Sequence, residues 1–146
     1  SLVGSEMCIR DRNKGHEWVQ DLSDIDSVVE NSEATEIIVD SFLSSFGYQN
    51  IGSVVSKIAS KLRMGGRLVI YENDIDLLSH QYTKSGMDIQ DINNLLFSDT
   101  AAIACVLNTE TIADLLEQMG LRIEERLINS DTMQSIITAR RKNNEN

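Results

Sequence analysis

The chain has 146 residues, of which 41% are hydrophobic, and its 23 acidic and 13 basic side chains give a formal net charge of -10. This length suits a single domain that buries its own hydrophobic core. The negative charge argues against direct binding of nucleic acid or of an anionic membrane, because both surfaces attract clustered Lys and Arg, and no apolar run approaches the roughly 20 residues of a membrane span.

The first residues of the chain, SLVGSEMCIRDR, stand apart from the rest. They show no helical or strand periodicity that continues into the following segment, and they lack the apolar region of a secretory signal. The stretch resembles the translated adapter or leader found at the front of some metagenome-derived reading frames, and a genuine but disordered terminus is the other interpretation. We therefore expect residues 1–12 to be a non-native or disordered leader, 13–142 to form the domain, and 143–146 to be a disordered tail.

Short elements are predicted next. Residues 16–20 suit a short strand, and Ser23 is suited to cap a brief helix over 24–30. The continuous apolar run at 36–40, bounded by polar residues, is typical of a strand covered on both faces. A loop or broken turn over 41–50 follows.

An amphipathic helix and a second strand come next in the sequence. Apolar residues recur at helical spacing on one face, at Ile51, Val54, Val55, Ile58, Ala59 and Leu62. Gly65 or Gly66 is suited to end this helix near residue 64, and 67–71 then reads as a buried strand. A strand–helix–strand connection is right-handed, so the strands at 36–40 and 67–71 should be parallel. The core should include Ile38, Leu62, Leu68 and Ile70.

The last third of the chain predicts two helices and a hairpin. One helix covers 88–97 with Ile89, Ile92, Leu95 and Leu96 inward, and the next is capped by Asn108 or Thr109 and ends at Gly120. Strands at 121–128 and 133–139 flank the turn signal Asn-Ser-Asp, and segment 132–139 should pair antiparallel with 67–71 or its neighbour. The expected fold class is α/β, a partial Rossmann-like sheet of parallel strands flanked by helices, with a C-terminal antiparallel hairpin.

This order of elements resembles the C-terminal portion of class I S-adenosylmethionine-dependent methyltransferases. The matching pieces are EIIVDSFLSSF, IGSVVSKIASKLRMGGRLVIYEND and TETIADLLEQMGLRIEERLINSDTMQSIITARRK, and together the resemblance spans about Trp18 to Lys142. The phrase NSEATEIIVDSFLSSF is most similar to predicted methyltransferases of phage and metagenome genomes. Met64 stands where the family usually has proline, and Ser45 where its loop often has histidine. The resemblance implies S-adenosylmethionine as the cofactor of the complete protein.

The resemblance also implies site residues at the carboxyl ends of the strands, where open α/β sheets bind ligands. Asp21 and Leu22 would contact the adenine region of the cofactor, and Asp40, Ser41 and Phe42 would form the neighbouring part of the pocket. Asp74 and Asp76 would contact the methyl acceptor. The alternative interpretations are solvated loop acids and, for Phe42, a core side chain.

One part of the family pattern is missing from the sequence. The glycine-rich turn that contacts the cofactor is absent, since no Gly-x-Gly occurs in the chain. We therefore expect an inactive portion of a methyltransferase whose acceptor, a small molecule or a surface group, is unknown. The alternatives are a methyltransferase-like binding or regulatory module without catalysis, or an unrelated Rossmann-like fold such as part of a dehydrogenase. A truncated sheet would also expose an unpaired strand near Trp18 and favour self-association.

Cysteine and histidine are too sparse for a metal or disulfide site. Cys8 and Cys105 are the only cysteines, and His16 and His80 are isolated in the sequence. We expect no metal, and a reducing, cytoplasmic compartment is the simplest interpretation.

Overall fold

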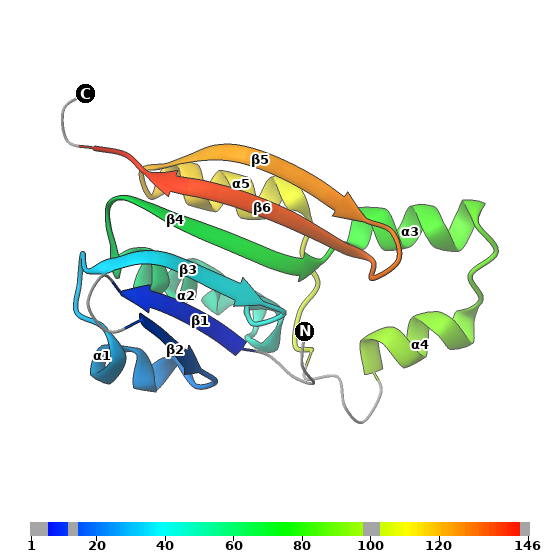
Figure 1. The fold of residues 1–146 in the computed structure, drawn as a ribbon. Helices are drawn as coiled ribbons and strands as arrows, with labels where there is room; N and C mark the ends of the chain where they lie inside the picture. The colour runs from blue at the N-terminus through cyan, green and yellow to red at the C-terminus, as the bar shows by residue number, and fades with distance from the viewer. Residues whose placement is uncertain (1–5, 12–14, 98–102, 144–146) are drawn as a thin grey trace.

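The computed structural model describes residues 6–11, 15–97 and 103–143, and Figure 1 shows these residues as one sheet with helices packed against it. The strands are β1 (Glu6–Asp11), β2 (Gly15–Val19), β3 (Ala34–Asp40), β4 (Leu62–Asn73), β5 (Leu121–Asn129) and β6 (Gln134–Arg141). The α-helices are α1 (Ile25–Val28), α2 (Ile51–Ala59), α3 (Ile75–Lys84), α4 (Ile89–Phe97) and α5 (Thr109–Gln118). Short 3-10 helices cover Leu22–Asp24, Leu43–Ser45 and Tyr48–Asn50.

The six strands are ordered β2-β1-β3-β4-β6-β5. β3 and β4 are parallel, as the crossover through α2 predicted, and β6 pairs antiparallel with β4 and with β5. The predicted fold class, with its C-terminal antiparallel hairpin, is therefore confirmed. Most dehydrogenase-type sheets stay parallel to their edge, so the antiparallel β5–β6 pair also argues against that alternative.

Strand β1 corrects the prediction that residues 1–12 lie outside the fold. Glu6–Asp11 pair antiparallel with both β2 and β3, so β1 is an interior strand of the sheet. Met7 and Ile9 are 0% and 1% exposed. The short stretch shows little periodicity by itself, but in the sheet its alternate apolar side chains join a core that β3 and β4 have already formed. The remaining residues of the predicted leader lie outside the described residues, as do 144–146 of the predicted tail.

The border between α2 and β4 also differs from the prediction. α2 ends at Ala59, five residues before Met64, and β4 begins at Leu62. The reason is tertiary hydrogen bonding, because the carbonyl groups of Ser60 and Lys61 accept backbone N–H groups of the segment 32–34. The glycines end no helix and lie instead where the β3–β4 register shifts.

Gly65 and Gly66 have backbone reasons to lack a side chain at this shift of register. Gly65 has a φ of 77°, in the left-handed region. A Cβ on Gly66 would lie 2.9 Å from the carbonyl oxygen of Arg63 and 3.0 Å from that of Ala34. The pair therefore allows β4 to bulge while it stays close to β3.

Apart from the early end of α2, the helices agree with the sequence except in three places. α5 is capped by Asn108, whose side chain accepts from the Thr111 N–H, and Gly120 follows it with a φ of 86°. The brief helix near residue 25 is preceded by a 3-10 turn capped by Asp21, so Ser23 is not the cap. α3 was not predicted, and α4 has no buried residue, with Ile89 63% exposed.

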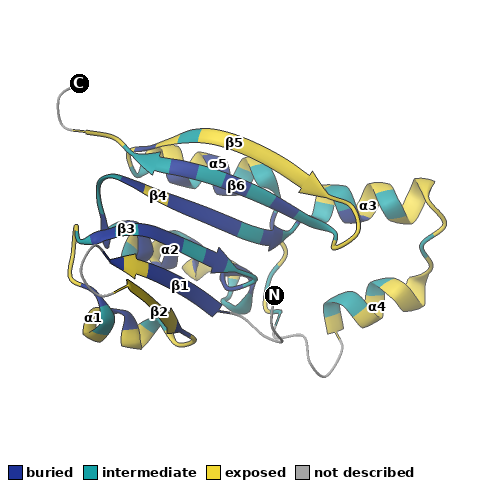
Figure 2. Ribbon diagram, viewed as in Figure 1, coloured by how far each residue is buried: buried dark blue, intermediate teal, exposed yellow. Residues whose placement is uncertain are grey.

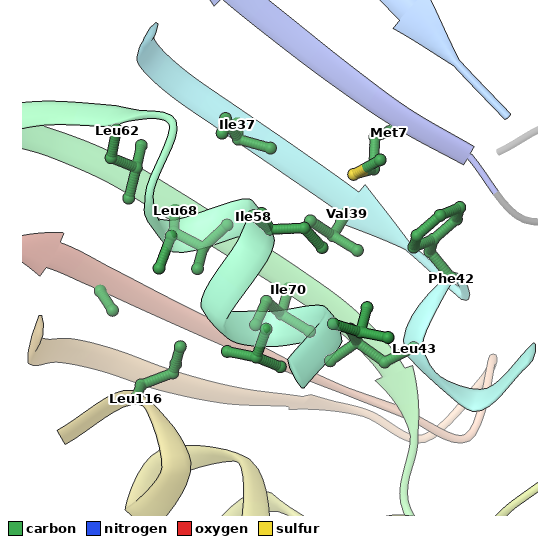
Figure 3. Packing of buried hydrophobic residues seen from close by; sticks show 14 of the residues in the cluster. Met7, Ile37, Val39, Phe42, Leu43, Ile58, Leu62, Leu68, Ile70 and Leu116 are labelled. Carbon is green, nitrogen blue, oxygen red and sulfur yellow. The ribbon is translucent and has the colours of Figure 1, made fainter. Parts of the chain in front are cut away.

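The core lies between the sheet and the helices α2 and α5, which cover one face (Figures 1 and 2). One row of side chains crosses four strands on this face, and each is at most 1% exposed: Met7, Val39, Ile70 and Ile137. Figure 3 shows Ile58 of α2 and Leu116 of α5 pointing into the same layer. Of the predicted core residues, Leu62, Leu68 and Ile70 are buried.

The other face of the sheet is not crossed by any helix within the described part of the chain (Figure 1). Ile38 points to this face and is partly exposed, so its predicted place in the core is wrong. The expectation of cover on both faces of β3 fails for the same reason. β2 is an edge strand and Trp18 is 61% exposed; self-association through this edge stays a prediction. No helix in the described ranges is long and apolar enough to cross a membrane.

Candidate functional site

The direction of the strands brings the predicted site residues to one edge of the sheet. β2 and β3 both run antiparallel to β1, so they are parallel to each other and to β4. Met7 of β1 lies opposite both Val19 and Val39, which places the ends of β2 and β3 at the same height. The chain leaves β2 toward Asp21 and leaves β3 at Asp40, so both acids belong to this carboxyl edge. Open α/β sheets bind ligands at such an edge.

The turn after β3 is held in an uncommon conformation. Ser41 has a φ of 54°, in the left-handed region that non-glycine residues rarely occupy. Three hydrogen bonds fix it: its N–H donates to the Tyr71 carbonyl at 2.9 Å, its Oγ donates to Asp40 Oδ1 at 3.0 Å, and Gln134 Nε2 donates to its Oγ at 3.1 Å. Strained residues of this kind gather at functional sites.

The other residues predicted to bind the cofactor differ in how far they are buried. Phe42 is 2% exposed and packs edge-on against Phe46, with ring centroids 5.2 Å apart, so its ring belongs to the core (Figure 3). Asp21 is exposed and accepts hydrogen bonds from the N–H and the Oγ of Ser23, which lower the pKa of its carboxyl group. Leu22 packs partly against the core.

A buried acid at the same edge was not predicted. Glu72, near the end of β4, is 0% exposed, and burial raises the pKa of its carboxyl group to about 7. Its Oε2 accepts the N–H of Ser44 at 3.3 Å, while its Oε1 has no partner among the described residues. Hydrogen bonds from the 43–44 turn oppose the effect of burial but do not cancel it. A carboxyl group with this pKa exchanges protons near neutral pH.

Glu72 has two neighbours with reactive side chains. Ser135 of β6 lies directly opposite it in the sheet, is 2% exposed, and has no described partner for its Oγ. The N–H of Cys105 donates to the Ser44 carbonyl at 3.2 Å, and burial together with the Glu72 charge raises the pKa of the Cys105 thiol. In the sequence, Glu72 is the acid at the end of the run RLVIYE. An acid at this position is typical of the polar end of a strand, so nothing local marked it as buried.

Asp74 and Asp76, the predicted acceptor-binding acids, lie just after β4. Asp74 is 5% exposed and both carboxylate oxygens are used within the protein. Oδ1 caps α3 by accepting the N–H groups of Asp76 and Leu77, and Oδ2 accepts the N–H and the Oγ1 of Thr109 at 3.0 and 2.7 Å. Asp76 is exposed in the first turn of α3. Asp74 therefore joins the start of α3 to the start of α5.

We expect Asp74→Ala to lower the free energy of unfolding by about 1–2 kcal/mol, because α3 loses its N-cap and Thr109 loses its acceptor. Asp76→Ala is the matched control and should change it by less than about 0.5 kcal/mol, since the side chain is exposed. Urea titration followed by circular dichroism measures both. Equal small losses in the two variants would contradict the structural role of Asp74.

No site for a metal ion is found in the described residues, which contain no suitable group of three His, Cys, Asp or Glu side chains.

Comparison with solved structures identifies the fold. An O-methyltransferase family protein from Burkholderia thailandensis superimposes with a TM-score of 0.60 and 19% identity, over 86% of this chain and 35% of that chain. Magnesium protoporphyrin IX methyltransferase from Synechocystis PCC 6803, with bound S-adenosylhomocysteine, gives 0.56 and 19% over 84% and 49%. An S-adenosylmethionine-dependent methyltransferase from Thermotoga maritima gives 0.54 and 13% over 78% and 59%.

These proteins are all longer than the present chain, which spans between 35% and 59% of their length. No family model matches the sequence, and no curated protein sequence matches it. The likeness therefore rests on the arrangement of the strands and helices. On that basis the chain has the fold of S-adenosylmethionine-dependent methyltransferases, over the part of those proteins that it spans.

Proposed function

We propose that this chain is the C-terminal portion of a methyltransferase that uses S-adenosylmethionine. The observation behind the proposal is the shared carboxyl edge of β2, β3 and β4, at which the Asp21, Asp40 and Glu72 segments meet in a fold shared with methyltransferases. The chain also spans only part of its structural neighbours, one of which contains bound S-adenosylhomocysteine. The methyl acceptor is proposed to be a small molecule or a surface group.

The residues at this edge fit one side of an adenosine-containing cofactor. Asp40 is half-buried and lies opposite Glu6 in the sheet, so two carboxylates are neighbours at this edge. Carboxylate oxygens accept hydrogen bonds, and they would accept them from hydroxyl and amino groups of the ligand. Asp21 lies two strands away, about 10 Å at the usual strand spacing. The cofactor would supply the methyl group on a positively charged sulfur. Asp40 and Glu6 would favour that charge, and the Ser41 turn would orient the ligand beside them.

The other side of the pocket is not formed by the described residues. β1 occupies the position beside β3 but runs in the opposite direction, so its carboxyl end at Asp11 lies opposite Ala34, at the far edge from Asp40. The sequence also contains no Gly-x-Gly turn. The backbone N–H groups that such a turn directs at a ligand are therefore missing, and we propose that the chain alone is inactive.

We expect the chain to bind S-adenosylmethionine about 5- to 150-fold more weakly than a complete pocket would, since two missing hydrogen bonds at 0.5–1.5 kcal/mol each give about 1–3 kcal/mol. Isothermal titration calorimetry of the purified monomer measures this affinity. Micromolar binding would contradict the incomplete pocket.

A second measurement tests whether the carboxyl edge is the site at all. A nuclear magnetic resonance titration with S-adenosylmethionine detects binding even when the dissociation constant is about 1 mM or higher. The chemical-shift changes should concentrate at the amides of Asp21, Asp40 and Ser41. Asp40→Asn should reduce these shifts, whereas the exposed control Asp76→Asn should leave them in place. Chemical-shift changes confined to other parts of the chain would exclude this edge as the binding site.

The alternative function is a methyltransferase-like binding or regulatory module. A protein from a longer reading frame that binds S-adenosylmethionine tightly but transfers no methyl group would favour it.

A further inference from the structure

A second candidate site lies at the opposite edge of the sheet, where β4 and β5 begin and β6 ends. A cavity of about 300 Å³ opens there, lined by Gly65, Arg122, Arg140, Arg141, Lys142 and Asn143. Gly65 and Glu72 are seven residues apart on β4, which corresponds to about 23 Å along an extended strand. The cavity is therefore separate from the edge proposed for methyl transfer.

The charge of this cavity is opposite to that of the whole protein. Four of the chain's 13 basic side chains line it, although the formal net charge of the chain is -10. Arg140 lies directly opposite Arg122 on one neighbouring strand and Arg67 on the other. Like charges in direct opposition destabilise a sheet, so this row of arginines is expected only where anions are close.

The anions that the described residues themselves supply are few. Glu124 accepts hydrogen bonds from Arg140 at 3.0 Å and Arg122 at 3.4 Å, and these bonds, that of Arg140 first, lower the pKa of the Glu124 carboxyl group. Glu36 pairs with Arg67. The hydrogen bonds found for Arg141 go to neutral oxygen atoms, the carbonyl of Leu62 and the Oγ of Ser32. Among the described residues, positive charge therefore remains in excess at the cavity.

Two of the arginines are held in place before any ligand arrives. Arg140 Nη1 donates to the Gly65 carbonyl at 2.7 Å and its Nε donates to Glu124, while Arg141 Nη1 donates to Leu62 and Ser32. A guanidinium group has more N–H donors than these bonds use. The remaining donors are thus available at fixed positions, and a ligand would lose little side-chain entropy by binding to them.

We propose that this cavity binds a small dianion of the phosphate class, either inorganic phosphate or the phosphate group of a small monoester. Arginine forms paired, charge-assisted hydrogen bonds with phosphate oxygens. The cavity volume is at the lower end of the range for small-ligand sites, which suits a phosphate group better than a large cofactor. Lys142 and Arg122 are exposed at the cavity and add charge there, and Arg122 also pairs with Glu124 at 3.4 Å.

The test uses the full chain and nuclear magnetic resonance titration with inorganic phosphate, and separately with glycerol 3-phosphate. Saturable shifts at the amides of Gly65 and Asn143 are expected in the unmodified protein. In the double variant Arg122→Gln/Lys142→Gln the dissociation constant should rise about 10-fold or more, since two charged donors are lost. The control Arg126→Gln removes one charge from an exposed position on the same strand, outside the cavity, and should change it by less than about 2-fold because distant surface charges are screened.

The outcomes separate the sources of the ligand and decide the proposal. Tighter binding of glycerol 3-phosphate identifies a monoester site, and equal or tighter binding of inorganic phosphate identifies a site for the free ion. Absence of saturable shifts at Gly65 and Asn143 in the unmodified protein, or an equal loss in the Arg126→Gln control, would overturn the site. So would a single-stranded oligonucleotide that binds more tightly than either phosphate with a steep salt dependence. Titration with S-adenosylmethionine is read at the Asp40 edge, so the two proposals fail independently.

Discussion

Replacing Leu62 by alanine should lower the free energy of unfolding by about 2–5 kcal/mol, the usual range for truncating a fully buried leucine. Leu62 is 0% exposed and begins β4, opposite Ala34 of β3, in the layer that Figure 3 shows beneath α2. The substitution removes buried apolar surface and leaves a cavity. That cavity cannot collapse easily, because the backbone of this segment is held by hydrogen bonds from residues 32–34 and from Arg141.

The matched control is Leu127→Ala on β5, where the leucine is 49% exposed. Its loss should stay below about 1 kcal/mol, because surface substitutions away from caps and ion pairs have small effects. Urea denaturation followed by circular dichroism measures both variants. A loss below about 1 kcal/mol for Leu62→Ala would mean that this residue does not pack in the core as the structure places it.

The unfolding free energy should also fall as pH rises from about 4.5 through 7, because of Glu72. Burial raises the pKa of this carboxyl group from 4.5 to about 7 in the folded protein. Between these values the folded state binds more protons than the unfolded state, so the contribution of Glu72 is fully present below pH 4.5 and is lost above pH 7. The shift corresponds to about 3 kcal/mol.

Glu72→Gln isolates this contribution, since the amide stays neutral at every pH. Relative to the unmodified protein, the variant should gain about 3 kcal/mol of stability between pH 4.5 and pH 8, whatever the offset between the two proteins at low pH. Glu125→Gln, at an exposed position on β5, controls for the removal of one carboxylate. Denaturant titrations over the pH range measure the difference. A pH-independent gap between Glu72→Gln and the unmodified protein would show that the pKa of Glu72 is the same in the folded and unfolded states, so that burial does not raise it.

Local patterns in the sequence predicted most of the α/β arrangement. Each of these patterns can be recognised within a single segment. They are the continuous apolar run at 36–40, the helical stripe from Ile51 and the apolar residues of 67–71. The right-handed crossover then required parallel strands, and the Asn-Ser-Asp turn required an antiparallel hairpin. The cap at Asn108 and the glycine at 120 were readable because their hydrogen bonds and backbone angles are local.

The elements that were predicted wrongly depend on partners far away in the sequence. The helix ends before residue 60 because the N–H groups of the segment 32–34 donate to the carbonyl groups of Ser60 and Lys61, although the apolar stripe continues to Leu62. Glu6–Asp11 are a strand only beside β2 and β3, which supply hydrogen bonds on both sides. Ile38 is outside the core because the described helices cover a single face of the sheet, a fact that no periodicity within β3 expresses.

The two candidate sites show the same difference between what local sequence predicts and what depends on distant partners. Asp21, Asp40 and Ser41 could be proposed from the sequence because the family resemblance points to residues that follow the strands, and parallel strands bring their ends to one edge. The protonation of Glu72 could not, since its pKa depends on desolvation by side chains from several segments. The arginine cavity also needed the assembled sheet: Gly65, Arg122 and Arg140 are separated along the chain and become neighbours only through the pairing of β4, β5 and β6. The order of residues in the sequence determines which residues lie at the end of each strand. Cross-strand register and burial determine which side chains those residues contact and whether they are charged.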